Sequence, residues 1–252
     1  MRITRDRWAA FSAFASLALG AAGVAFERAD PSVLAAGPTE LAGWARRHHV
    51  ALLAQSALFG TSATPMLVFF AGLQSYLASR GSAAAVGRVD LSLMVLAAGA
   101  VWVMLNLLGQ VLQVRMAVLA ARGGSAHDVA SLAGLSRTVV TTGNAGVAVA
   151  AAATGLVSLR DDGGLPRWLG RLSAVTAGLH LLSLAGLRVR RGPLSRNGVL
   201  AYLPYPVFAG WLVGVAVTML RRPRDVTGPG EEQTVTGRRA KAPQRTPLER
   251  WP

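Results

Sequence analysis

Six long apolar runs constrain this 252-residue chain more than any other feature. A membrane-spanning helix needs about 20 consecutive, mostly apolar residues, because the hydrocarbon core of a bilayer is about 30 Å thick. The sequence therefore predicts an all-α, polytopic membrane bundle of about six transmembrane helices within residues 1–224. The runs cover residues 8–26, 50–77, 91–114, 138–159, 168–187 and 199–220.

Composition and charge support the membrane interpretation. Only 15% of the residues are charged, against about 25% in an average soluble domain. The net charge of +14 is typical of nucleic-acid-binding proteins, but the arginines lie between the apolar runs and in a tail, not along one soluble face. We therefore expect the lipid bilayer as the main partner and no nucleic acid. The absence of cysteine excludes disulfides, thiolate nucleophiles and cysteine metal sites.

The first run has two interpretations. It follows Arg2, Arg5 and Arg7, and the small residues Gly23 and Ala25 have the spacing of a signal-peptide cleavage site. Its length of 19 residues exceeds the roughly 7–15 of a signal-peptide core. We therefore expect an uncleaved helix, with cleavage as the alternative.

The segments between the runs are predicted as loops. Residues 28–49 contain charged residues and two prolines and are expected outside the membrane, with room for one short surface helix. Residues 115–137 are predicted as a loop because they contain arginines, glycines and His127. Residues 225–252 are polar, basic and rich in Gly, Pro and Thr, so we predict a disordered tail.

The arginine and lysine residues indicate how the chain is oriented in the membrane and what kind of organism it comes from. With the amino terminus inside, 16 of these residues lie on the cytoplasmic side and 10 outside, so the positive-inside rule favours cytoplasmic termini. Arginine outnumbers lysine 25 to 1 in a chain rich in Ala and Gly, as a high-GC coding sequence produces. We expect a multi-pass protein of a bacterial cytoplasmic membrane.

Three short segments resemble a known type of protein. They are FFAGLQSYL at 69–77, followed by Arg80, then TGLVSL at 154–159 and GLPRWLGRLS at 164–173. They are similar to segments of a family of small, uncharacterised bacterial membrane proteins with six predicted helices. The resemblance implies a fold and carries no activity.

The residues offer little for catalysis or metal binding. No carboxylate lies within a run, which argues against a proton relay, because such relays place Asp or Glu inside the bundle. Asp161 and Asp162 lie in a Gly- and Pro-containing turn, and adjacent His48 and His49 point about 100° apart on a helix. We expect no cofactor and no metal. An intramembrane enzyme that uses His180, the histidine inside a run, is the weakest hypothesis.

The strongest polar pattern is a set of uncharged side chains. Asn106, Gln110 and Gln113 lie on one stripe of the third predicted helix. Because alternate helices run in opposite directions, other polar positions fall in the same half of the membrane. The remaining half is expected to be packed almost wholly by Ala, Val, Leu and Gly. The candidate binding residues are Gln55, Asn106, Gln110, Gln113, Thr141, Asn144, His180, Tyr202 and Tyr205.

Two interpretations are open for these side chains, and two for the function of the protein. They either hydrogen-bond helix to helix, at about 0.6 kcal/mol per pair, or line a pocket or vestibule. We expect a non-enzymatic, partner-binding or scaffold component of the cell envelope. The alternative is a carrier or channel-like protein for a small uncharged or lipophilic solute. Arg221, Arg222 and Arg224 follow the last run and are expected to face anionic lipid headgroups.

Overall fold

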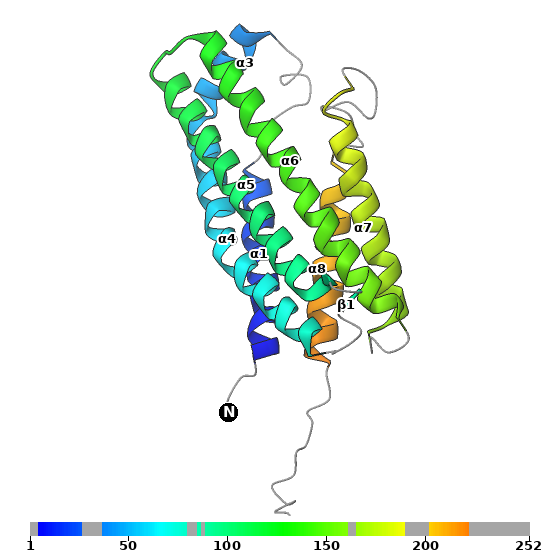
Figure 1. Ribbon diagram of the computed structural model, residues 1–252. Helices are drawn as coiled ribbons and strands as arrows, with labels where there is room; N and C mark the ends of the chain where they lie inside the picture. Colours follow the sequence, from blue (N-terminus) through cyan, green and yellow to red (C-terminus); the bar gives the residue numbers. More distant parts are fainter. Residues whose placement is uncertain are drawn as a thin grey trace, which may run out of the picture. The chain divides into compact units, whose positions relative to one another are not determined.

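The computed structural model describes residues 5–26, 37–79, 85–86, 89–160, 165–189 and 202–221. These residues form seven α-helices and one two-stranded antiparallel sheet, in which Val86 lies opposite Val89 (Figure 1). The strands are β1 (Ala85–Val86) and β2 (Val89–Asp90). The helices are α1 (Arg5–Ala25), α3 (Pro38–Arg47), α4 (His49–Ala78), α5 (Leu91–Ala121), α6 (Ala126–Leu159), α7 (Arg167–Ala185) and α8 (Pro204–Leu220).

The predicted all-α class is confirmed, and each of the six apolar runs corresponds to one helix. Among the described residues, α1, α4, α5 and α6 are long and apolar enough to cross a membrane. Four such helices indicate a membrane protein whose apolar surface contacts lipid. The count of six spans stays a prediction, because α7 includes Arg167 and Arg171 and α8 has only 17 residues.

The predicted loop at 115–137 is wrong. Helix α5 continues to Ala121 and α6 already begins at Ala126, so the connection is only a few residues long. At 1.5 Å per residue these helices are about 46 and 51 Å long, well beyond the roughly 30 Å of the hydrocarbon core. The charged residues in this segment suggested a loop, but its apolar residues recur at helical spacing.

Those helix extensions form a small second core, which we call the cap. Helix α3 packs on it with Leu41 and Trp44 buried, and the Nε of Arg46 donates a hydrogen bond of 3.2 Å to the carbonyl of Ala120. This bond ties α3 to the end of α5, where the Ala120 carbonyl also accepts from the backbone N–H of Gly123. The predicted short helix in residues 28–49 is therefore a packed element. The buried cap residues are Leu41, Ala42, Trp44, Ala45, Leu52, Met116, Ala117, Ala120 and Val129.

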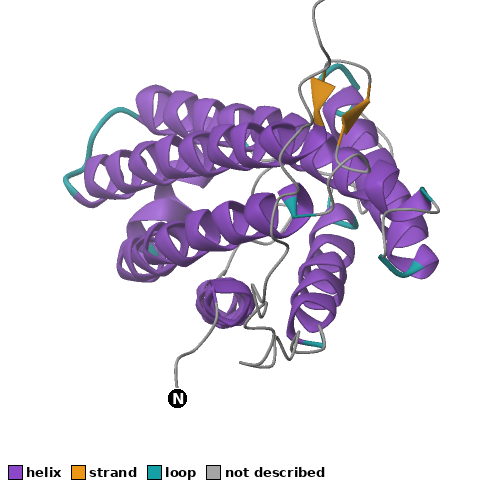
Figure 2. Cartoon of the chain, turned by 60° about the horizontal axis from the view of Figure 1, so that its bottom comes forward, coloured by secondary structure: helices purple, strands orange, loops and turns teal. Residues whose placement is uncertain are grey.

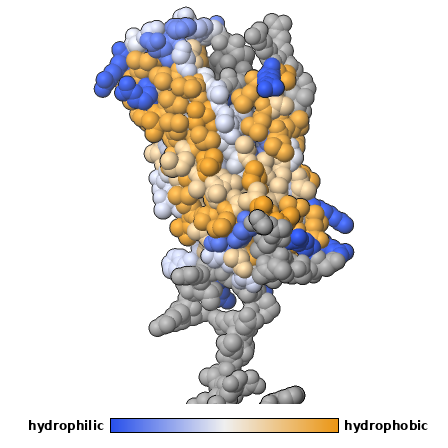
Figure 3. Space-filling view, in the orientation of Figure 1, coloured by the Kyte–Doolittle hydropathy of each residue, from blue (hydrophilic) through white to orange (hydrophobic). Residues whose placement is uncertain are grey.

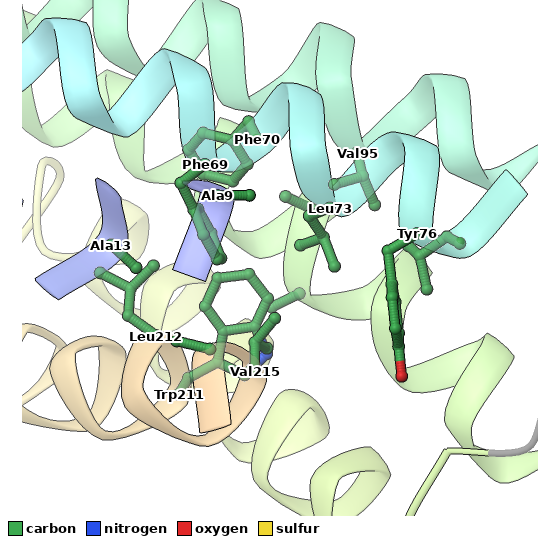
Figure 4. Close-up of a cluster of buried hydrophobic side chains, with 14 of the residues drawn as sticks. Ala9, Ala13, Phe69, Phe70, Leu73, Tyr76, Val95, Trp211, Leu212 and Val215 are labelled. Atoms are coloured by element: carbon green, nitrogen blue, oxygen red, sulfur yellow. The ribbon is translucent and has the colours of Figure 1, made fainter. Parts of the chain in front are cut away.

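The six long helices pack in a ring. Each contacts its neighbour in chain order from α4 to α8, and α1 contacts both α4 and α8, which closes the ring (Figure 2). Large side chains fill the interior. Phe69 and Phe70 from α4 and Trp211 from α8 are fully buried, with Ala9 and Ala13 of α1 against them (Figure 4).

Apolar and polar residues occupy different parts of the outer surface. Exposed apolar side chains such as Val101, Met104 and Val175 cover the middle of the bundle, and the face in view has an apolar band with hydrophilic residues gathered at both ends (Figure 3). Exposed arginines lie at the ends of helices, for example Arg122 after α5 and Arg221 after α8. This distribution fits a lipid-embedded bundle.

Asp90 begins α5. Its carboxylate accepts hydrogen bonds from the backbone N–H groups of Ser92 and Leu93, at 2.8 and 3.3 Å, and from the Ser92 hydroxyl at 2.7 Å. The Ser92 hydroxyl is the largest cause that holds the pKa of Asp90 below its usual value. Capping of this kind satisfies the free N–H groups at the start of a helix.

Candidate functional site

Six of the nine predicted polar residues fall into two groups in the cap-side half of the bundle. The first group, which we call the upper amide group because it lies nearer the cap, contains Gln55 and Ser56 of α4 with Gln110 and Gln113 of α5. The central cluster lies deeper, and four helices contribute to it. Its members are Trp102 and Asn106 of α5, Asn144 of α6, His180 and Ser183 of α7, and Phe208 of α8.

The upper amide group joins α4 to α5. The Nε2 of Gln113 donates a hydrogen bond of 2.8 Å to the Oε1 of Gln55 and one of 3.4 Å to the carbonyl of Leu52. One turn away on α5, the buried Oε1 of Gln110 has no hydrogen-bond partner among the described residues, and neither has the Oγ of Ser56. This group is therefore only partly satisfied.

The central cluster joins α6 to α7 through a short chain of hydrogen bonds. The Nδ2 of Asn144 donates to the Oγ of Ser183 at 2.9 Å, and that hydroxyl donates to the backbone carbonyl of His180 at 2.7 Å. Asn144 is 2% exposed and His180 is 1% exposed. Ser183 and His180 share one face of α7 because they are three residues apart.

Aromatic rings form the other side of the central cluster. The Phe208 ring lies edge-to-face with the rings of His180 and Trp102, at centroid distances of 5.7 and 5.2 Å. Trp102 lies against α6 where Gly143 and Gly146 leave room for it. Asn106, one turn further along α5, donates from its Nδ2 to the Trp102 carbonyl at 2.8 Å.

Three buried atoms of the central cluster lack partners. The Oδ1 of Asn144 and both ring nitrogens of His180 make no hydrogen bond within the described part of the chain. A buried polar atom left unsatisfied costs about 1–3 kcal/mol. The edge-to-face contact with Phe208 is a weaker interaction and does not replace hydrogen bonds to two nitrogens. These three atoms are the groups of the cluster that a bound hydrogen-bonding molecule would satisfy.

An aromatic layer lies beneath the cluster, on the side away from the cap. Phe70 contacts Trp102 at 6.3 Å between centroids, and the Nε1 of Trp211 donates to the Oγ of Ser173 at 2.9 Å. Phe69 contacts Trp211 at 6.2 Å between centroids, and both residues are labelled in Figure 4. Buried aliphatic residues such as Leu73, Leu77 and Val95 follow in the lower half. The stripe of amides therefore ends at this layer.

Several predicted site residues lie elsewhere. Thr141 is partly buried on α6, whereas Tyr202 and Tyr205 are 41% and 44% exposed, on the outside of the bundle. Arg221 is exposed just after α8. Arg222 and Arg224, like the predicted tail, lie outside the described residues.

The prediction that the other half of the bundle contains almost only Ala, Val, Leu and Gly is wrong. Besides the aromatic rings, it buries the hydroxyls of Thr154, Ser158 and Ser173. Thr154 and Ser158 donate to the carbonyls of Ala150 and Thr154, each four residues earlier. A hydroxyl satisfied by its own helix is easily buried, so polarity alone does not mark one half of the bundle.

Sequence reasoning missed Trp102, Ser183 and Phe208 as members of the site. Ser183 had a usable signal, because it follows His180 by three residues and so shares its helix face. The two aromatic residues had none, since apolar residues occur throughout the spans. Their role depends on which helices are neighbours across the ring.

Neither possible metal ligands nor similarity to known proteins assigns a function to these residues. In the part of the chain that the structure describes, no three His, Asp or Glu side chains come close enough to hold a metal ion. Comparison with protein-family models, with curated proteins and with solved structures finds no match.

Proposed function

We propose that this chain is a multi-pass protein of a bacterial cytoplasmic membrane that binds a small uncharged or lipophilic solute at the central cluster. The observation that carries the proposal is the burial of Asn144 Oδ1 and both His180 ring nitrogens without partners. Binding groups are commonly retained at a cost in stability. A solute that hydrogen-bonds to these atoms recovers that cost.

The stripe of amides on α5 supports entry from the cap end. Gln113, Gln110 and Asn106 follow one another over about 10 Å of helix, from the level of the cap to the central cluster. The aromatic layer beneath them favours a binding site or a half-channel over a continuous pore. With cytoplasmic termini, which we also propose, the cap end is external.

Cysteine labelling tests this route, since the natural chain has no cysteine. Asn106→Cys and Gln110→Cys should react with a membrane-impermeant maleimide that is added on the cap side only. Met104→Cys, on the lipid-facing side of α5, and Val95→Cys, below the aromatic layer, are matched controls that should stay unlabelled. Labelling of the two amide positions from the opposite side, or no labelling of either, contradicts the proposal.

A partner-binding or scaffold role is the second candidate, and the cap favours it. The cap is a packed surface beyond the apolar band, and it exposes Arg47 and Arg122. If a protein partner binds there, it should co-purify in stoichiometric amount with the natural chain and be lost from Arg47→Glu and Arg122→Glu. Arg171→Glu, at the other end of the bundle, is the control that should retain it.

The resemblance to the family of small six-helix bacterial membrane proteins also stays a proposal. Two of its segments, 69–77 and 164–173, contribute Phe69, Phe70 and Ser173 to the aromatic layer. That location favours a structural role for those motifs and adds nothing about the solute.

A further inference from the structure

The free hydrogen-bonding groups of the central cluster restrict what its ligand can be. A neutral imidazole has one N–H donor and one bare nitrogen acceptor, and both His180 nitrogens lack partners among the described residues. The Oδ1 of Asn144 is a further acceptor without a partner there. The cluster therefore offers one donor and two acceptors, so a ligand that only accepts hydrogen bonds would leave both acceptors unsatisfied.

A hydroxyl group pairs with two of these three groups. It donates one hydrogen bond and accepts up to two, so a single O–H can accept from the His180 N–H and donate to the Asn144 Oδ1, which a group that only accepts cannot do. Carbonyl, ether and quinone oxygens only accept. A cationic ligand is disfavoured because described carboxylates such as Glu40, Asp90 and Asp128 lie near the starts of other helices, whereas His180 lies within α7.

The walls of the cluster indicate the shape of the ligand. Phe208 presents its ring to both His180 and Trp102, and the Trp102 ring in turn contacts Phe70. Aromatic pairs favour edge-to-face and offset arrangements, which add to the energy of area burial. A flat ring fits such a wall better than a flexible chain does.

We infer that the central cluster binds a neutral aromatic compound with a hydroxyl group, of the phenol or naphthol class. This inference rests on the proposed function and makes it specific. The hydroxyl binds to His180 and Asn144, and the ring lies against Phe208 and Trp102. Ser183 positions Asn144 by accepting from its Nδ2.

A matched pair of probes tests the hydroxyl. 2-Naphthol and 2-methoxynaphthalene have the same ring, but only the first donates a hydrogen bond. Binding is measured by titration calorimetry on the full chain in lipid nanodiscs, so that partition into lipid is common to all variants. The chain should bind 2-naphthol about tenfold more tightly than 2-methoxynaphthalene, since a factor of ten corresponds to about one net hydrogen bond.

Variants localise that binding. His180→Phe keeps a ring against Phe208 and removes both nitrogens, and Asn144→Leu removes the amide. Each should lower 2-naphthol affinity by about tenfold or more, whereas Met104→Leu, on the lipid-facing surface, should not change it. Unchanged helical circular dichroism and elution volume establish that a variant is folded. Where Asn144→Leu does not fold, His180→Phe alone decides.

Two outcomes overturn the inference. Equal affinity for both probes removes the requirement for a hydroxyl, and 2-naphthol affinity that is unchanged in a folded His180→Phe removes the site. A third probe, cyclohexanol, separates the failure of this inference from the failure of the proposed function. If cyclohexanol binds in a way that depends on His180 and 2-naphthol does not bind, the ligand is not aromatic but the solute site is supported. The cysteine labelling tests that site independently.

Discussion

Gln110 and Gln113 lie one turn apart on α5, and their environments differ. The Gln113 amide is paired with Gln55, and the Gln110 Oε1 is buried without a partner in the described region. A paired amide between helices contributes about 0.6 kcal/mol, and at most about 1.7. An amide oxygen that is buried without a partner contributes no such bond and costs its desolvation.

Gln113→Leu should therefore lower the free energy of unfolding in detergent by about 0.6–1.7 kcal/mol, because it leaves Gln55 without a partner. Gln110→Leu should leave it unchanged or raise it. Reversible unfolding in mixed micelles measures both variants under the same conditions. If the two substitutions destabilise equally, Gln110 has a partner and the partly satisfied upper amide group is wrong.

The same residues mark the limit of prediction at this scale. Spacing along the chain placed Asn106, Gln110 and Gln113 on one face, and all three lie in the cap-side half. Spacing does not show which amide finds a partner, because that depends on the register between α4 and α5. The exposed positions of Tyr202 and Tyr205 depend likewise on the rotation of the chain near the start of α8.

The contact between α5 and α6 depends on glycine at the level of the central cluster. A Cβ on Gly146 would overlap the carbonyl oxygen of Ala98, and it would lie 3.0 Å from the Cβ of Trp102. The absence of a side chain thus lets the two backbones approach, as is common between helices in membranes. This approach sets the position of Trp102.

Gly146→Ala should destabilise the protein by about 1–3 kcal/mol, the usual cost of overpacking, because backbone cannot move as a flexible side chain can. Gly178→Ala is the matched control, since its Cβ would meet nothing within 4 Å. It should keep or raise stability by up to about 1 kcal/mol through helix propensity. Thermal unfolding followed by circular dichroism compares them. A Gly146→Ala protein as stable as the natural chain contradicts the close approach.

At the scale of elements, hydropathy predicted where helices occur and failed on where two of them end. Residues 115–137 carry arginines and a histidine, so the hydropathy of the sequence ended one predicted span at 114 and began the next at 138. The apolar side chains Met116, Ala120 and Val129 nevertheless extend both helices, because α3 covers them. That partner is distant in sequence, so the cap was not predictable from either helix alone.

The whole bundle has its first and last long helices side by side. Helix α1 begins and α8 ends at the same end of the bundle, opposite the cap, and the two helices contact each other (Figure 1). If all six long helices cross the membrane, both termini face the same compartment. The positive-inside rule then predicts the cytoplasm as that compartment.

Reporter fusions test this topology. Successive fusions along the chain should alternate between outside and inside, beginning outside. Two consecutive fusions that report the same side would show that a helix does not cross, and α7 and α8 are the helices most directly tested. The fusion points are after Phe26, Arg80, Arg122, Asp162, Arg191 and Asp225.

The central claim is that His180 is kept for a ligand and lowers the stability of the ligand-free bundle. The most direct measurement is the free energy of unfolding of ligand-free His180→Phe and His180→Leu, two apolar replacements of which the first keeps a ring and the second is closer to histidine in volume. At least one of the two variants should be as stable as the natural chain or more stable, because two unsatisfied ring nitrogens are removed. If both variants lose more than about 1 kcal/mol, the scale of a satisfied hydrogen bond, then His180 supports the fold and the solute site is contradicted.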